Sequence, residues 1–319
     1  MSAVRGLTRR SLGSTGIEVT SICFGTSPLA NLVELYGYAV EDQRAVETVQ
    51  AIFAGPVNFL DTSNGYGEHG ESEQRIGEAI RRSGGLPAGV VLATKIDPDP
   101  RTGDFSGARV RASFEESLAR LGLDRVPLPS LHDPERMTFE AGVAAGGPLD
   151  ALIALRDEGL VDYIGVAGGP VGLLGQYLAT EALDYVLTHN RFTLMDRSAE
   201  ALLDDARARG MGTLNAAPYG GGMLVKGPDA QPRYAYGARD AGIAERARAM
   251  KAACDRHGVP LAAAALQFSV REPRIDSTVV GVSSPERIAQ TVALLDVVIP
   301  DELWDELAGL TAPRELWLG

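Results

Sequence analysis

Short apolar segments alternate with amphipathic helical patterns eight times along this chain. The segments are almost continuously apolar, which is typical of strands that are buried on both faces of a parallel sheet. Between them, apolar side chains recur at helical spacing, as Val110, Phe114 and Leu118 do, so each helix has one apolar face to pack against a sheet. Eight strand–helix units in series predict a (β/α)8 barrel, the TIM-barrel class of α/β fold. The predicted strands span residues 21–25, 58–63, 90–95, 127–132, 163–167, 185–190, 213–217 and 278–283.

Residues 1–319 are predicted to form this single domain, because no linker or shift in composition divides the chain. Before the first strand, residues 8–12 and 17–19 flank a turn with two glycines, a pattern that predicts a β-hairpin at the bottom of the barrel. Two long segments, 133–147 and 220–239, follow the fourth and seventh strands. Long loops in a compact domain are usually functional, so we expect these two segments to bind ligands.

The net charge of the chain is −12, from 30 Lys+Arg against 42 Asp+Glu. This balance disfavours binding to nucleic acid and to anionic membranes, because both are themselves negatively charged. No apolar segment approaches the length of a membrane span, and no signal-peptide pattern follows the arginines near the N-terminus, so we expect a soluble cytoplasmic protein. The two cysteines, Cys23 and Cys254, lie in apolar segments, which predicts buried thiols and no disulfide scaffold.

Polar residues end three successive predicted strands. Asp61, Lys95 and His132 lie at or near the ends of the second, third and fourth strands, and Tyr66 follows Asp61 by five residues. In a (β/α)8 barrel the carboxyl ends of all strands meet at one face, where active sites lie. We therefore expect these four side chains to converge at one place.

The four side chains suit the interconversion of an alcohol and a carbonyl by hydride transfer, which requires a proton to move to or from the oxygen. Lys95 near Tyr66 would favour the phenolate and lower its pKa from about 10, while Asp61 would keep the lysine charged. His132 would donate a hydrogen bond to the substrate oxygen. Taken singly, a lysine or tyrosine here is more often a surface residue, and the histidine could bond to a backbone carbonyl. Their arrangement on successive strands favours the catalytic interpretation.

Several short stretches of this sequence carry a family resemblance. They are Phe24-Gly25-Thr26, Asn58-Phe59-Leu60-Asp61-Thr62-Ser63, Tyr66-Gly67, Ser72-Glu73, Ala93-Thr94-Lys95, Leu131-His132-Asp133 and Gly165-Val166. Together they resemble the aldo-keto reductases. The resemblance covers nearly the whole chain. The sequence around His132 is most similar to the aldose 1-dehydrogenase branch of that family. The resemblance implies a (β/α)8 barrel, a catalytic tetrad of Asp61, Tyr66, Lys95 and His132, and NAD or NADP bound without a Rossmann domain.

The resemblance also indicates where the cofactor binds. Residues 218–224 match the family's loop over the pyrophosphate, and residues 281–291 its adenosine-phosphate segment. Arg287 could reach a 2′-phosphate, but Gly281 and Ser283 stand where related sequences often have Lys or Arg, so NAD is favoured over NADP. The usual Ser-Asn pair that holds the nicotinamide amide is replaced by Ala167-Gly168-Gly169, and the usual glutamine by His189 or Asn190. The predicted cofactor-binding residues are Gly25, Thr26, Gly168, Asn190, Ala217, Pro218, Tyr219, Gly222, Leu224, Gly281, Ser283, Arg287, Gln290 and Thr291.

Other classes of site fit the sequence less well. Residues 65–70 match the G-x-G-x-x-G pattern of a Rossmann domain, but the nearby glutamates would repel a pyrophosphate, and that fold does not explain eight serial units. None of the four histidines pairs with another at ligand spacing and no cysteine cluster exists, so no metal site is predicted. The G-x-S-x-G pattern of serine hydrolases is missing.

Within the family, the expected reaction is the NAD(P)-dependent oxidation of an aldose at C1 to its lactone. The alternatives are oxidation of pyridoxal, reduction of an aldehyde or ketone by NADPH, and a non-catalytic subunit that senses nicotinamide. The expected partner is a small molecule, a sugar or an aldehyde, and the sequence leaves the oligomeric state open. Candidates to line its pocket are Tyr36, Tyr38, the segment 133–147, and Trp304 or Trp317.

Overall fold

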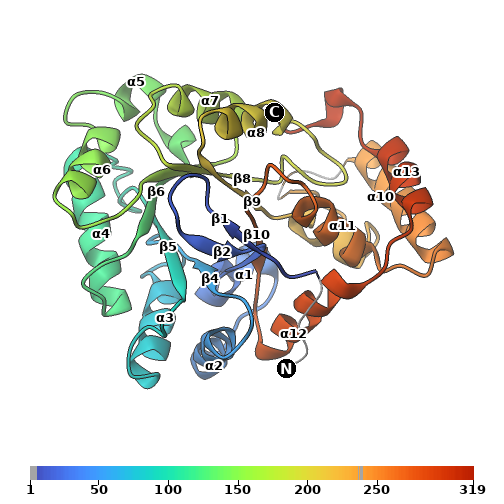
Figure 1. Ribbon diagram of the computed structural model, residues 1–319, viewed down its shortest axis with the longest axis horizontal. Helices are drawn as coiled ribbons and strands as arrows, with labels where there is room; N and C mark the ends of the chain where they lie inside the picture. Colours follow the sequence, from blue (N-terminus) through green and yellow to red (C-terminus); the bar gives the residue numbers. More distant parts are fainter. Residues whose placement is uncertain (1–5, 236, 238–239) are drawn as a thin grey trace.

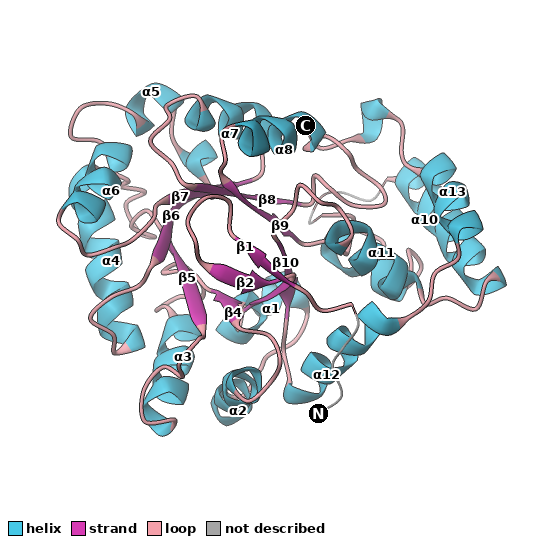
Figure 2. Cartoon of the chain, in the orientation of Figure 1, coloured by secondary structure: helices cyan, strands magenta, loops and turns pink. Residues whose placement is uncertain are grey.

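The computed structural model describes residues 6–235, 237 and 240–319 of the chain. Eight parallel strands close into a barrel in the order β10-β3-β4-β5-β6-β7-β8-β9, and helices surround them (Figures 1 and 2). This confirms the predicted (β/α)8 fold. It also excludes a Rossmann domain, which has an open sheet. The strands are β3 (Ile22–Gly25), β4 (Phe59–Asp61), β5 (Val91–Ile96), β6 (Leu128–His132), β7 (Gly165–Gly168), β8 (Tyr185–His189), β9 (Gly212–Ala216) and β10 (Ser277–Gly281).

The predicted N-terminal hairpin is also present. Strands β1 (Arg9–Ser11) and β2 (Glu18–Thr20) pair antiparallel and lie in the middle of the ring of strands in Figure 1. The backbone N–H of Gly13 donates to the carboxylate of Asp276, which immediately precedes β10, over 3.0 Å. Because this contact lies at the amino end of β10, the hairpin covers the bottom of the barrel and leaves the carboxyl ends of the strands open.

The helices outside the barrel begin and end where the sequence has capping signals. In α4, the hydroxyl of Ser106 accepts from the backbone N–H of Arg109, and Gly122 ends the helix with a φ of 66°. Pro148 and Pro285 each begin a helix, a position where a missing N–H costs nothing. The helices are α1 (Val33–Tyr36), α2 (Asp42–Phe53), α3 (Glu71–Arg82), α4 (Gly107–Leu121), α5 (Phe139–Gly142), α6 (Pro148–Asp157), α7 (Val171–Leu178), α8 (Glu200–Ala208), α9 (Met223–Lys226), α10 (Ala241–Arg256), α11 (Leu261–Val270), α12 (Pro285–Ala293) and α13 (Asp301–Leu310).

Besides the short helices α1, α5 and α9, two longer helices were not predicted from the sequence pattern. Helix α11 is apolar around most of its circumference, because it is buried against β10 and α10, and a helix without a polar face has no stripe to detect. Helix α13 packs against α10 at the side of the barrel (Figure 1).

The two segments predicted as loops also contain short helices. The first, 133–147, contains the 3-10 turn Pro134–Arg136 and α5. The second, 220–239, contains the 3-10 turn Gly220–Gly222 and α9, and its residues 236, 238 and 239 lie outside the described part.

The two cysteines are buried, free thiols, as predicted. Burial also raises the pKa of the Cys23 and Cys254 thiols, which keeps them protonated. Among the described residues, none of the helices combines the length and the apolar character needed to cross a membrane.

Candidate active site

A cavity of about 1350 Å³ lies at the carboxyl ends of the barrel strands. Asp61, Tyr66, Lys95 and His132 all line it, so the structure brings together the four side chains that the strand ends predicted. A pocket for one small ligand usually measures about 300–1,000 Å³. The cavity is therefore large enough for a second, larger molecule beside a small substrate.

The centre of the site is a buried ion pair. The Lys95 Nζ lies 2.5 Å from Oδ2 of Asp61, and the two residues are only 2% and 4% exposed. The same ammonium donates to the backbone carbonyl of Thr62 over 2.7 Å and to the Tyr66 hydroxyl over 3.0 Å. All three hydrogens of the ammonium thus have an acceptor, which fixes the lysine and places a positive charge against the phenol oxygen.

His132 contacts the ring of Tyr66. The two rings meet edge to face, with centroids 5.7 Å apart. His132 ends β6 and Lys95 lies on the neighbouring β5, where it is paired with Ser130. Because side chains alternate between the two faces of a strand, this register brings Lys95 and His132 to the same cavity.

A fifth polar residue, Asp97, belongs to the same cluster and was not predicted from the sequence. Its Oδ1 lies 2.7 Å from Nδ1 of His132, and its Oδ2 accepts from the Gly65 backbone N–H over 2.7 Å and from the Ser63 hydroxyl. Asp97 follows the end of β5 by one residue and Lys95 by two, so it shares the face of Lys95. That spacing was the available signal in the sequence.

Burial and neighbouring charges have opposite effects on the pKa values of Asp97 and His132. Burial alone would raise the pKa of Asp97, but the charge of His132 and the hydrogen bonds from His132, Ser63 and Gly65 outweigh it and lower that pKa to about 2. Burial alone would lower the pKa of His132, but Asp97 outweighs it and raises that pKa above its usual 6.5. Asp97 is therefore ionised at neutral pH, and His132 retains its proton more readily than a free histidine.

Most of the predicted cofactor-binding residues border the cavity, and four do not. Thr26, Asn190, Pro218 and Leu224 are buried outside the lining. The hydroxyl of Thr26 donates to the backbone carbonyl of Asp61 over 3.0 Å, so its side chain supports the strand end. The residues that line the cavity are Gly25, Gly168, Ala217, Tyr219, Gly222, Gly281, Ser283, Arg287, Gln290 and Thr291.

The groups that line the cavity fit a dinucleotide. Ser283, Arg287 and Gln290 bring a hydroxyl, a guanidinium and an amide from the first turns of α12 and the loop before it, and such donors suit a phosphate. Gly221 and Gly222 have φ values of 68° and 96°, a backbone that residues with a side chain rarely adopt and that exposes peptide groups to a ligand. Together with the volume of the cavity, these groups could hold NAD or NADP.

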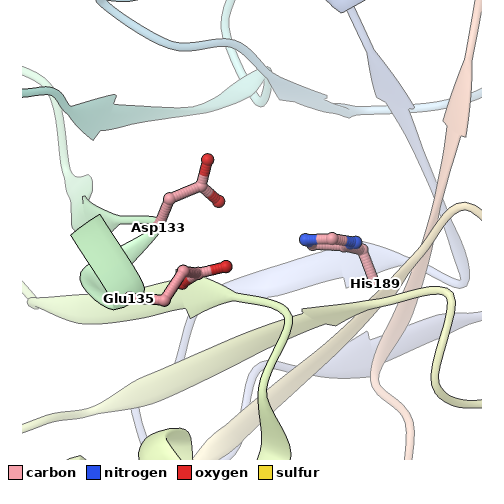
Figure 3. A group of neighbouring side chains, drawn as sticks. All are labelled: Asp133, Glu135 and His189. Carbon is pink, nitrogen blue, oxygen red and sulfur yellow. The ribbon is translucent and has the colours of Figure 1, made fainter. Parts of the chain in front are cut away.

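A second group of polar side chains lies beside His132, and two of its members, Asp133 and His189, line the cavity. Asp133, Glu135 and His189 offer ligand atoms that all lie within 4.8 Å of one another, and Figure 3 shows the two carboxylates turned toward the imidazole. Burial, followed by the charge of Arg191, lowers the pKa of His189 to about 4, so its ring is neutral. Such a group could form hydrogen bonds with the hydroxyls of a ligand. The spacing of histidines in the sequence could not reveal this group, because its members come from two different strand ends. The expectation that the protein has no metal site stays a prediction.

Among the aromatic residues expected in the pocket, Tyr36 and Tyr38 line the cavity. From the segment 133–147, Asp133 and Arg136 line it as well. Trp304 and Trp317 instead pack with the apolar cluster around α10 and α13, away from the site. The two tryptophans therefore have a packing role, whereas the two tyrosines border the cavity.

Comparisons with known proteins agree with this geometry. A family model described as "Aldo/keto reductase family" matches residues 21–312. The chain is 31% identical to D-threo-aldose 1-dehydrogenase of a Pseudomonas species, over 94% of this chain and 97% of the relative. It is 32% identical to L-galactose dehydrogenase of Arabidopsis thaliana (89% and 86%) and 29% identical to pyridoxal 4-dehydrogenase of Microbacterium luteolum (94% and 96%).

The solved structures give the same architecture. The holo form of an aldo-keto reductase from Bacillus halodurans superposes with a TM-score of 0.78 over 98% of both chains, at 20% identity, which supports the fold. The match of the family model to most of the chain, and the relatives above 30% identity, decide the family. The chain belongs to the aldo/keto reductase family.

Proposed function

We propose that this protein oxidises an aldose at C1 to its lactone with NAD(P), and that Asp61, Tyr66, Lys95 and His132 are its catalytic residues. The observation that supports this most directly is the contact of the buried Lys95 ammonium with both Asp61 and the Tyr66 hydroxyl, at one end of a cavity large enough for a dinucleotide and a sugar.

In this reaction Tyr66 acts as the general base. The Lys95 ammonium, 3.0 Å from its oxygen, stabilises the phenolate that must accept the proton of the C1 hydroxyl. Asp61 compensates the charge of the lysine in its buried position. His132 donates a hydrogen bond that orients the substrate oxygen. A bound oxidised nicotinamide would supply the acceptor for the hydride that leaves C1.

Two observations support a sugar as the substrate. The relatives named above include D-threo-aldose 1-dehydrogenase and L-galactose dehydrogenase, at 31% and 32% identity. The group of Asp133, Glu135 and His189 adjoins His132, with Oδ1 of Asp133 3.7 Å from Nε2 of that histidine. Two carboxylates can accept hydrogen bonds from neighbouring hydroxyls, which a polyhydroxylated substrate has and a simple aldehyde lacks.

A substrate panel tests the proposal. The purified protein is incubated with aldoses, pyridoxal and simple aldehydes, each with NAD(H) and with NADP(H), and reduced nicotinamide is followed by its absorbance. We expect oxidation of at least one aldose, with a kcat/KM above those for pyridoxal and for aldehydes. Turnover of pyridoxal alone, or reduction of simple aldehydes alone, would refute the sugar as substrate, and binding of NAD(H) without turnover of any compound would refute the enzyme.

The choice of cofactor leads to a further prediction. Around α12, Arg287 is the residue that brings a positive charge to the cavity lining, while Gly281 and Ser283 bring none. Glu286 adds a carboxylate, which pairs with Arg44 over 2.7 Å. We therefore propose that NAD is the preferred cofactor. Ser283→Arg is expected to shift the ratio of the Kd values for NAD and NADP toward NADP by about 10-fold or more, the effect of one charge-assisted hydrogen bond of about 1.5–3 kcal/mol.

The matched control for this variant is Ser83→Arg, which adds the same charge on an exposed residue after α3, away from the cavity. Isothermal titration with each cofactor measures both Kd values without any turnover. Equal ratios in wild type and Ser283→Arg would show that this segment does not contact the 2′-position of the cofactor.

A further inference from the structure

We propose that Asp97 is a positioning residue for the reaction. By accepting the hydrogen on Nδ1 of His132, Asp97 leaves Nε2 as the ring nitrogen available to the substrate oxygen, and Nε2 donates a hydrogen bond only while the ring is an imidazolium. This role rests on the proposed function, in which His132 faces the oxygen of an alcohol or a carbonyl.

The carboxylate of Asp97 is held rigidly. It is 4% exposed, and it accepts from the Gly65 backbone N–H over 2.7 Å and from the Ser63 hydroxyl. Glycine at 65 is needed for this contact, because a Cβ there would lie 2.7 Å from Cγ of Asp97. The backbone N–H of Asp97 donates to Ser113 of α4 over 3.1 Å. With its position fixed from both sides, the carboxylate determines how the His132 ring is oriented.

The contact also determines which ring nitrogen of His132 bears a hydrogen. An ionised carboxylate can only accept hydrogen bonds, so the 2.7 Å contact between Oδ1 of Asp97 and Nδ1 of His132 requires a hydrogen on Nδ1. That hydrogen is present in the neutral and in the charged ring. Nε2 is then a lone-pair acceptor in the neutral ring and a donor only in the imidazolium. A hydrogen bond from His132 to a carbonyl oxygen, which itself has only lone pairs, therefore requires the charged ring.

Charged groups at the ends of three strands determine up to which pH the His132 ring stays protonated. Asp97 after β5 and Asp133 after β6 favour the imidazolium, while Lys95 on β5 and His189 on β8 oppose it. Burial also opposes it, and Tyr66 contacts the ring edge to face. The two carboxylates prevail, which raises the pKa of His132. We therefore expect reduction of a carbonyl substrate to slow as the pH rises through the titration midpoint of His132. The proton that the oxygen gains comes from Tyr66, and His132 keeps its own.

Nuclear magnetic resonance of the protein labelled with ¹⁵N-histidine tests the assignment without cofactor or substrate. The four imidazoles are distinguished by comparison with His132→Asn. We expect His132 to have its hydrogen on Nδ1 in the neutral form and to titrate above 6.5. A neutral ring with its hydrogen on Nε2, or a midpoint at or below that value, would overturn the proposal.

The variant Asp97→Asn removes the charge and keeps the shape of the side chain. We expect it to lower the His132 midpoint by about 1 pH unit or more, as loss of a close opposite charge does. The pH profile of kcat/KM for carbonyl reduction should move by the same amount. If kcat/KM fell by the same factor at every pH and the His132 midpoint did not change, Asp97 would only support the fold.

Asp276→Asn is the matched control, because Asp276 is also buried and accepts from backbone N–H groups, of Gly13 and Thr213, at the other end of the barrel. We expect it to leave the His132 midpoint unchanged. If the protein turns over neither alcohols nor carbonyls, the proposed function fails, while the imidazole titration of wild type and Asp97→Asn still decides what Asp97 does to the ring.

Discussion

Tyr66→Phe is expected to lower kcat for alcohol oxidation by about 10²–10⁴-fold, the usual contribution of a general acid or base. The phenol oxygen contacts the Lys95 ammonium over 3.0 Å and lines the cavity, so the variant removes the one atom proposed to take the proton. The phenylalanine ring can keep the edge-to-face contact with His132. We therefore expect the Kd for the nicotinamide cofactor to stay within about threefold of wild type. An interaction that is made only in the transition state contributes to kcat and not to the binding of the cofactor.

Tyr163→Phe is the control for this variant. The Tyr163 hydroxyl donates to the backbone carbonyl of Thr15 at the bottom of the barrel, so its loss removes a hydrogen bond far from the cavity. It should leave kcat within about twofold of wild type, because a residue that does not touch the reacting atoms contributes no transition-state binding. A Tyr66→Phe enzyme as fast as wild type would remove Tyr66 from the mechanism.

The positions of Asp61, Lys95 and His132 could be predicted because each ends, or nearly ends, a continuous apolar strand. The barrel topology then places all strand ends on one face, so three residues distant in sequence become neighbours. Asp97 was not predicted in this way, because it lies one residue beyond the end of β5. Its role depends on Ser63 and Gly65, which approach it from the loop after β4, and no pattern within the β5 segment contains that information.

The cofactor site was less predictable, because the direction of a side chain changes with every residue. His189 lines the cavity while the next residue, Asn190, is buried outside its lining. The sequence left both open as replacements for the usual glutamine, and a shift of one position in a strand exchanges the two faces. The same holds for Gly25, which borders the cavity, and Thr26, which bonds to the backbone of β4.

Lys95→Met is expected to lower the free energy of unfolding by about 3–5 kcal/mol and to abolish measurable oxidation. The variant leaves the carboxylate of Asp61 buried without its ammonium partner, and an uncompensated buried charge costs about that much. It also leaves the backbone carbonyl of Thr62 without its donor. Urea denaturation at constant pH measures the loss. As a control, Lys251→Met breaks an exposed pair with Asp255 on α10 and should cost less than about 1 kcal/mol.

The double variant Asp61→Leu/Lys95→Met separates stability from catalysis. Replacing both partners of a buried ion pair by apolar residues of similar size is often neutral or stabilising, because no charge remains to be desolvated. We therefore expect the double variant to regain most of the stability lost in Lys95→Met and to remain inactive, since nothing is left to stabilise the Tyr66 phenolate. Such a result would show that the pair is kept for the chemistry and not for the fold. A double variant as unstable as Lys95→Met would instead indicate that the pair itself holds the strand ends together.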